Sequence, residues 1–132
     1  MNIILSIHPK WARLIYEGEK TIEWRKTSPL RANKSVVYIY ETAPIKKITG
    51  SFIFNGLYLL DAYEKTWIDN YNERGIDIIG SGRVPIDELQ KYQNNSRVLR
   101  GWCRAGALRF DSPKSLEDFG IKRPPQSWRY VE

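Results

Sequence analysis

The stretch GEKTIEWRK, residues 18–26, concentrates charge at the junction between two predicted elements. Gly18 follows a segment, residues 9–17, in which apolar residues recur at helical spacing, and a glycine suits the left-handed end of a helix. The residues after it alternate in character and predict a strand, which places Glu23 and Arg25 on one face. Lys20 stands just before them, so a lysine, a carboxylate and an arginine are expected to lie close together.

The same patterns outline the rest of the chain. Alternating or β-branched runs predict strands over residues 2–7, 20–26, 35–42, 48–61 (as one strand or two), 100–110 and 128–131. Helical spacing predicts helices over residues 62–74 and 85–95 and a helical turn at 116–119, with a loop over 75–85. Gly50 and Gly56 mark a bulge or a close backbone approach. The pattern predicts an α+β fold, a small and mostly antiparallel β-barrel flanked by short helices.

Composition narrows the classes of protein. A chain of 132 residues predicts a single domain over residues 1–132. Lysine and arginine outnumber aspartate and glutamate by 21 to 15, and the pI near 9.5 favours a nucleic-acid partner over a basic protein without one. One cysteine, Cys103, and one histidine predict no disulfide, no metal site and no cofactor; Cys103 is expected in the core. No apolar run is long enough to span a bilayer and no signal peptide is evident, which predicts a cytoplasmic protein without a membrane partner.

The spacing of Gly18, Lys20, Glu23 and Arg25 fits the pattern G-x-K-x-x-E-x-R. This pattern resembles the hallmark of the ASCH domain, a branch of the PUA-like β-barrels. Three flanking segments also resemble that family: LSIHPKWARLIYEGEKTIEWRK (residues 5–26), VYIYETAPIKKITGSF (37–52) and SLEDFGIKRPPQSWRYV (115–131). The resemblance covers nearly the whole chain and implies a PUA-like barrel with the motif in a cleft between barrel and helices. One local departure is His8, where relatives often carry a lysine.

The charged motif is the predicted ligand-binding site. Lys20 and Arg25 are candidates for contact with a phosphate or a base carbonyl, and Glu23 for accepting from a base amine or fixing the lysine. The alternative is that Glu23 only pairs with one of the cations, which stabilises little when the pair is exposed. The cleft implied by the resemblance favours the functional interpretation. Trp24 points to the opposite face of the strand and is expected in the core.

Other residues extend the predicted site. Tyr40, Thr42 and Lys46 are expected to form the wall of the cleft near the hairpin. Arg123 and Trp128 combine charge with an aromatic ring, which suits binding of unpaired bases, although Trp128 could equally pack on the barrel. A second basic run contains four arginines, which suit a polyanion or form a solvated face: Arg97, Arg100, Arg104 and Arg109.

Three functions remain open. The first is a nucleic-acid-binding module, most plausibly for RNA, that holds an unpaired or modified nucleotide in the cleft. The second is an enzyme in which Lys20 and Glu23 are catalytic. The resemblance implies either a metal-assisted ribonuclease, with a divalent ion, or an N4-acetylcytidine amidohydrolase. The amidohydrolase is less favoured, because its pattern has a threonine where this chain has Glu23. The third is a protein-interaction module in transcription or translation.

Overall fold

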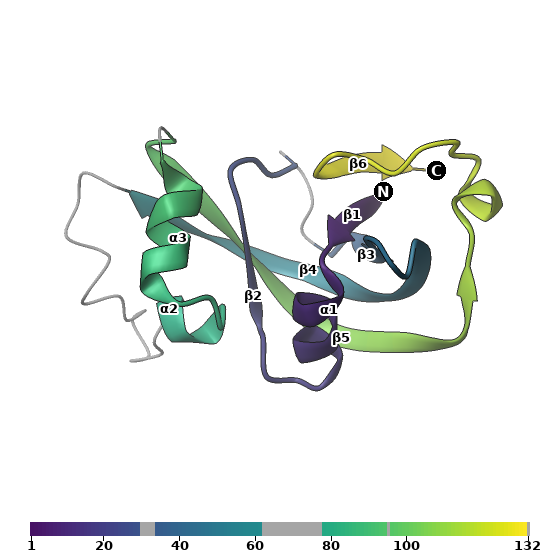
Figure 1. The fold of residues 1–132 in the computed structure, drawn as a ribbon, viewed down its shortest axis with the longest axis horizontal. Coiled ribbons are helices and arrows are strands. Elements are labelled where there is room, and N and C mark those ends of the chain that lie inside the picture. Colours follow the sequence, from purple (N-terminus) through teal and green to yellow (C-terminus); the bar gives the residue numbers. More distant parts are fainter. Residues whose placement is uncertain (30–33, 62–77, 95, 132) are drawn as a thin grey trace.

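The computed structural model of the protein describes residues 1–29, 34–61, 78–94 and 96–131 (Figure 1). Six strands form one sheet: β1 (Asn2–Ile7), β2 (Ile22–Arg25), β3 (Val36–Glu41), β4 (Lys47–Asp61), β5 (Val98–Lys114) and β6 (Trp128–Val131). Three helices and a 3-10 turn accompany them: α1 (Pro9–Tyr16), α2 (Ile78–Ser81), α3 (Ile86–Gln93) and η1 (Leu116–Phe119). None of the helices described is long and apolar enough to cross a membrane.

The sheet is mostly antiparallel, which confirms the predicted α+β class. Its order is β2-β5-β4-β3-β1-β6, and β1 with β3 is the parallel pair among the described strands. The long strands β4 and β5 run along most of the molecule, with α2 and α3 at one end and β1, β3 and β6 towards the other (Figure 1). Three register shifts interrupt the β4–β5 pairing. Such bulges bend and twist a ladder, so the sheet curls into a barrel-like shape without closing.

Side chains connect the two outer strands of this sheet. Arg25 on β2 donates from Nη2 to the Ser6 carbonyl of β1 at 2.5 Å and from Nη1 to the Ser127 hydroxyl, just before β6, at 3.2 Å. The indole of Trp128 on β6 donates to Thr27 Oγ1, just after β2, at 2.8 Å. The motif strand therefore lies against the β1–β6 side of the barrel, where a cleft can form.

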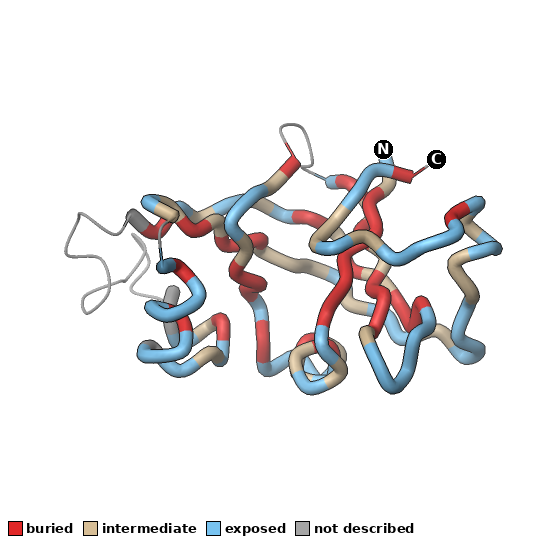
Figure 2. Tube along the Cα trace, turned by 45° about the horizontal axis from the view of Figure 1, so that its top comes forward, coloured by how far each residue is buried: buried red, intermediate tan, exposed pale blue. Residues whose placement is uncertain are grey.

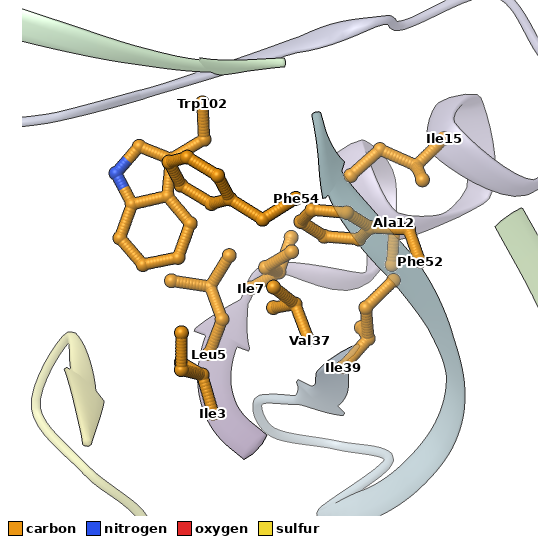
Figure 3. Close-up of a cluster of buried hydrophobic side chains, with 10 residues drawn as sticks. All are labelled: Ile3, Leu5, Ile7, Ala12, Ile15, Val37, Ile39, Phe52, Phe54 and Trp102. Atoms are coloured by element: carbon orange, nitrogen blue, oxygen red, sulfur yellow. The ribbon is translucent and has the colours of Figure 1, made fainter. Parts of the chain in front are cut away.

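The main core lies between the strands and α1. It draws apolar side chains from β1, α1, β3, β4 and β5, shown in Figure 3 as Ile3, Leu5, Ile7, Ala12, Ile15, Val37, Ile39, Phe52, Phe54 and Trp102. The buried segments in Figure 2 follow the same strands through the centre of the molecule. Each valine, leucine, isoleucine or phenylalanine side chain in this set contributes roughly 1.5–3 kcal/mol when fully buried. A second cluster of Ile22, Trp24, Leu60, Leu89 and Leu99 attaches α3 to the motif strand.

Most predicted elements are confirmed. Residues 48–61 belong to one strand, which is one of the two predicted alternatives, and β5 extends beyond the predicted 100–110. The predicted loop 75–85 is wrong at its centre, because Ile78–Ser81 form a helical turn. The helix predicted over 62–74 lies outside the described residues. Gly50 confirms a close approach at a bulge: a Cβ there would lie 2.2 Å from the Leu108 carbonyl oxygen.

Candidate functional site

The turn from α1 into β2 sets the position of the charged motif. α1 begins at a cap in which His8 Nδ1 accepts from the Lys10 amide at 3.1 Å. The helix ends at Tyr16, and Gly18, two residues further on, has a φ of +84°, which confirms the predicted left-handed residue. The Lys20 amide then donates back to the Leu14 carbonyl at 3.0 Å. This short reversal turns the lysine inward under the helix.

Lys20, Glu23 and Arg25 form a buried charge cluster. Lys20 Nζ lies 3.2 Å from Glu23 Oε1 and also donates to the carbonyl of Gly82, in the segment between α2 and α3. Arg25 donates from Nη2 and Nε to Glu23 Oε2, at 2.7 and 3.0 Å. Lys20 has no exposed surface and Glu23 is 7% exposed. The Glu23 carboxylate is therefore held between two cations, with Lys20 at Oε1 and Arg25 at Oε2.

Burial and pairing act on this cluster in opposite directions. Burial alone would raise the pKa of Glu23, but the charges of Lys20 and Arg25 outweigh it and hold that pKa below its ordinary value. Burial lowers the pKa of Lys20, and the Glu23 carboxylate opposes this effect. The carboxylate thus stays ionised at neutral pH, where it can accept hydrogen bonds but is a weak proton acceptor.

Arg25 is mostly committed to the protein. A guanidinium has five N–H donors. The described residues receive four hydrogen bonds from it: two go to Glu23, one to the Ser6 carbonyl and one to the Ser127 hydroxyl. Counting partners among the described residues alone, one N–H, on Nη1, is left for a ligand. Arg25 can therefore donate one hydrogen bond to an acceptor atom of a ligand. Its main effect is to hold Glu23 and the edge of the barrel in place.

A cavity of about 390 Å³ opens beside this cluster, and we call it the motif hollow. Residues of β1, α1, β2, the end of β3 and α3 surround it: Ser6, His8, Trp11, Glu23, Trp24, Arg25, Thr42, Val84, Glu88, Leu89 and Tyr92. Three of these side chains are aromatic and two are carboxylates. The volume lies within the range of small-molecule pockets, roughly 300–1,000 Å³, and an apolar wall with a few polar groups is typical of them.

The structure brings only part of the predicted site together. Glu23, Arg25 and Thr42 line the motif hollow. Lys20 lies behind Glu23, with no surface towards the hollow. It therefore positions the carboxylate and does not itself reach a ligand in this conformation.

The other predicted residues lie elsewhere. Tyr40 is 5% exposed and belongs to a third apolar cluster with Ile4 and Ile48, because strand alternation turns it away from the main core. Lys46 is exposed in the turn before β4, and Arg123 is exposed before β6. Neither lines the motif hollow.

Trp128 packs on the barrel, which was the alternative to its predicted role in binding bases. Its ring meets Trp102 edge to face at 5.9 Å between centroids, and its indole N–H donates to Thr27 Oγ1 at 2.8 Å. Cys103 is half-buried against the cluster that contains Trp24, and burial raises the pKa of its thiol to about 11. Both side chains are used in packing.

Sequence reasoning missed the wall contributed by α3. Glu88 and Tyr92 stand four residues apart on that helix, so they share a face. Tyr92 is 41% exposed, and Lys26 Nζ lies 5.1 Å above its ring. The spacing was visible in the sequence, but no local pattern says which element that face meets. Trp24 was expected in the core and is 4% exposed, yet it also lines the hollow.

The described residues contain no group of three or more His, Cys, Asp and Glu side chains arranged to hold a metal ion. Glu23 already pairs with two cations. The donor set in the described part of the hollow therefore does not fit a metal held by protein side chains alone, and no chemical step is derived through one.

The sequence model of the ASCH domain matches residues 5–114. The chain belongs to the ASCH domain family. A curated relative, large ribosomal subunit protein uL22 of Ureaplasma parvum, is 24% identical over 133 residues, which cover 99% of this chain and 39% of that protein. An ASCH domain-containing ribonuclease of Zymomonas mobilis is 38% identical over 47 residues, which cover 36% of this chain and 32% of the ribonuclease. The matched parts thus span about a third to two fifths of these relatives.

Solved structures of the ASCH family share the fold. The crystal structure of ASCH from Zymomonas mobilis superposes with a TM-score of 0.80 at 19% identity, over 99% of this chain and 87% of that one. A tyrosine-to-phenylalanine variant of the same protein gives 0.81 at 20% identity, over 99% and 90% of the two chains. At this identity the likeness concerns the fold, and it supports the predicted PUA-like architecture.

Proposed function

We propose that this ASCH domain binds single-stranded RNA and holds one unpaired base in the motif hollow. The observation that carries the proposal is the hollow itself, in which aromatic rings lie beside a fixed, ionised carboxylate. A net charge of +6 favours a polyanion. Among the relatives, one is named a ribonuclease and another a protein of the large ribosomal subunit. Both names support RNA as the ligand class.

Each group in the hollow has a part in this proposal. Trp11 and Tyr92 line the hollow with rings that can stack on a base, since every base has a π-face. Lys10 and Lys20 lie over the Trp11 ring and Lys26 over the Tyr92 ring, so the base would use the ring surface that these cations leave. The Glu23 carboxylate accepts from an exocyclic amine or ring N–H of the base. His8 Nδ1 already accepts from the Lys10 amide, so neutral His8 carries its proton on Nε2 and can donate to a base carbonyl. Lys20 fixes Glu23 from behind.

A fluorescence anisotropy titration with a short single-stranded RNA tests the proposal. Tyr92→Ala removes a partly exposed ring from the hollow, and Lys34→Gln serves as the control. Lys34 is exposed before β3, at the opposite end of that strand from Thr42. Loss of a stacking ring costs about 1–3 kcal/mol, so Tyr92→Ala should weaken binding about 5- to 150-fold and Lys34→Gln only slightly. Equal affinities of Tyr92→Ala and wild type would refute the base pocket.

Cleavage of the bound RNA is the second candidate, because one relative is named a ribonuclease. Glu23 is a poor general base here, since its pKa is lowered. Histidine is the commonest proton-transfer side chain, and His8 lines the hollow. The same samples, run on a denaturing gel, should show shortened RNA if the domain cleaves. His8→Asn keeps a capping side chain, and because His8 also contacts the base in this proposal, the variant should lose cleavage by a larger factor than it loses affinity; unchanged cleavage by this variant would exclude His8.

A further inference from the structure

A second cavity lies next to the motif hollow, and we call it the α1 hollow. It measures about 310 Å³ and is lined by Pro9, Lys10, Arg13, Glu41 and Arg109. Neighbouring residues of the chain line the two cavities at two places. His8 lines the first and Pro9 the second, and Thr42 lines the first and Glu41 the second. Trp11 of α1 lines the first and Arg13 of α1 the second, so this helix lies between the two hollows.

The α1 hollow is rich in positive charge, although Lys10 Nζ also lies 4.6 Å from the centroid of the Trp11 ring. It has three cations, Lys10, Arg13 and Arg109, against one carboxylate, Glu41. The shortest approach of Arg109 to Glu41 is 3.8 Å, from Nη1 to Oε2, which is too long for a hydrogen bond. Arg13 faces Glu17 at 3.7 Å, and both side chains are more than half exposed, so that pair contributes little. Within the described part of the chain, the guanidinium N–H groups of Arg13 and Arg109 therefore remain for a third partner.

Arg109 is half exposed but packs on a well-anchored ring. Its guanidinium stacks on the ring of Tyr16, 4.2 Å from the centroid. The Tyr16 hydroxyl shares a 2.7 Å hydrogen bond with Thr49 Oγ1, and burial raises the pKa of this phenol to about 12, so it stays neutral. Gly50 makes room for the ring, because a Cβ there would lie 2.6 Å from the Tyr16 hydroxyl. A planar cation with free N–H groups on a fixed platform is suited to bidentate contact with a phosphate.

Other arginines of the same basic run are used differently. Arg100 donates to the Lys26 carbonyl at 2.8 Å, and Arg104 to the Lys20 carbonyl at 3.1 Å. Both thus tie β5 to the motif strand. Arg109, in contrast, lines the α1 hollow.

We propose that the α1 hollow is a phosphate subsite, in which Lys10, Arg13 and Arg109 bind a backbone phosphodiester of the RNA strand whose base enters the motif hollow. This inference rests on the proposed function, because it places the strand relative to the bound base. Because neighbouring residues, His8 with Pro9 and Thr42 with Glu41, line the two hollows, one extended strand can reach from one to the other. The subsite also gives the domain a means to prefer a strand over a free nucleoside.

The test measures the salt dependence of RNA binding for Arg13→Gln and Arg109→Gln, with Lys34→Gln as the charge-matched control. Each lost phosphate contact should reduce the slope of log affinity against log salt by about 0.7 for a single strand. Affinity at low salt should fall about tenfold, the scale of one hydrogen bond to a charged group. Binding of a free nucleoside should not change. Arg13→Gln is the safer variant for folding, because Arg109 is the cation nearest the buried Glu41.

The outcomes separate this inference from the proposed function. If both arginine variants behave like Lys34→Gln while Tyr92→Ala loses affinity, the phosphate subsite is overturned and the base pocket stands. If the arginine variants lose slope and affinity but Tyr92→Ala does not, the phosphate contact is supported and the base pocket is overturned. If wild type binds no RNA, both are overturned. Loss of slope in the arginine variants together with weaker binding by Tyr92→Ala supports both.

Discussion

Replacing Lys20 by methionine isolates the contribution of the buried ammonium group to the stability of the folded protein. Methionine keeps a long apolar stem and removes the ammonium, which leaves the Gly82 carbonyl without its donor and Glu23 with Arg25 alone. Removing one partner of a buried ion pair costs about 3–5 kcal/mol. Because Arg25 still compensates the carboxylate, we expect the lower end, about 3 kcal/mol. The free energy of unfolding of a native domain is roughly 5–15 kcal/mol, so the variant should still fold.

Urea unfolding, followed by tryptophan fluorescence, measures this loss. Lys34→Met is the matched control on an exposed site and should stay within about 0.5 kcal/mol of wild type. Glu23→Gln and the double variant Lys20→Met/Glu23→Gln complete a cycle. In that cycle the double variant should be more stable than the sum of the single losses predicts, by about 0.5–3 kcal/mol. A loss below about 1 kcal/mol for Lys20→Met, or strict additivity, would refute the reasoning that the pair is a coupled, buried unit.

Three further predictions concern packing, pH and thiol chemistry. Gly50→Ala places a Cβ within 2.2 Å of the Leu108 carbonyl oxygen and 2.6 Å of the Tyr16 hydroxyl, so it should lower the free energy of unfolding by roughly 1–3 kcal/mol in urea; a neutral change would mean that the bulge relaxes freely. The folded pKa of Glu23 lies below the ordinary 4.5, so its contribution to stability is complete above that pH and is lost as the pH falls through the folded value. The stability difference between wild type and Glu23→Gln should therefore shrink below pH 4.5, and a constant difference down to pH 3 would contradict the lowered pKa. Burial raises the pKa of Cys103 to about 11, so iodoacetamide at pH 8 should alkylate it at least about tenfold more slowly in the folded protein than in urea, as read by mass spectrometry; equal rates would show that the thiol is not protected.

The local elements were predictable because their signals are local. Helical spacing after Pro9, a left-handed glycine at Gly18 and alternation through Trp24 depend on neighbours a few residues away. The closeness of Glu23 and Arg25 followed from the same alternation, because residues two apart on a strand share a face. Sequence reasoning could therefore name the charged cluster and its strand.

The composition of the pocket was not predictable in this way. Tyr40 and Tyr92 illustrate why. Tyr40 was expected in the cleft because it lies near Thr42 along the chain, yet its ring belongs to the cluster on the other face of β3. Tyr92 lines the hollow because α3 packs on β2 through Leu89 and Trp24, a contact between segments more than sixty residues apart. No local periodicity encodes such a contact.

The family, the strand that carries the motif and the positive net charge follow from the amino-acid sequence alone. How the individual charges are used depends on the three-dimensional packing. Burial removes water from Lys20, which makes it a support for Glu23 and not a ligand-binding group. Packing ties Arg100 and Arg104 to backbone carbonyls and leaves Arg109 beside a cavity. The reason is that the role of a charge depends on its solvent and its partners, and residues distant in sequence supply both.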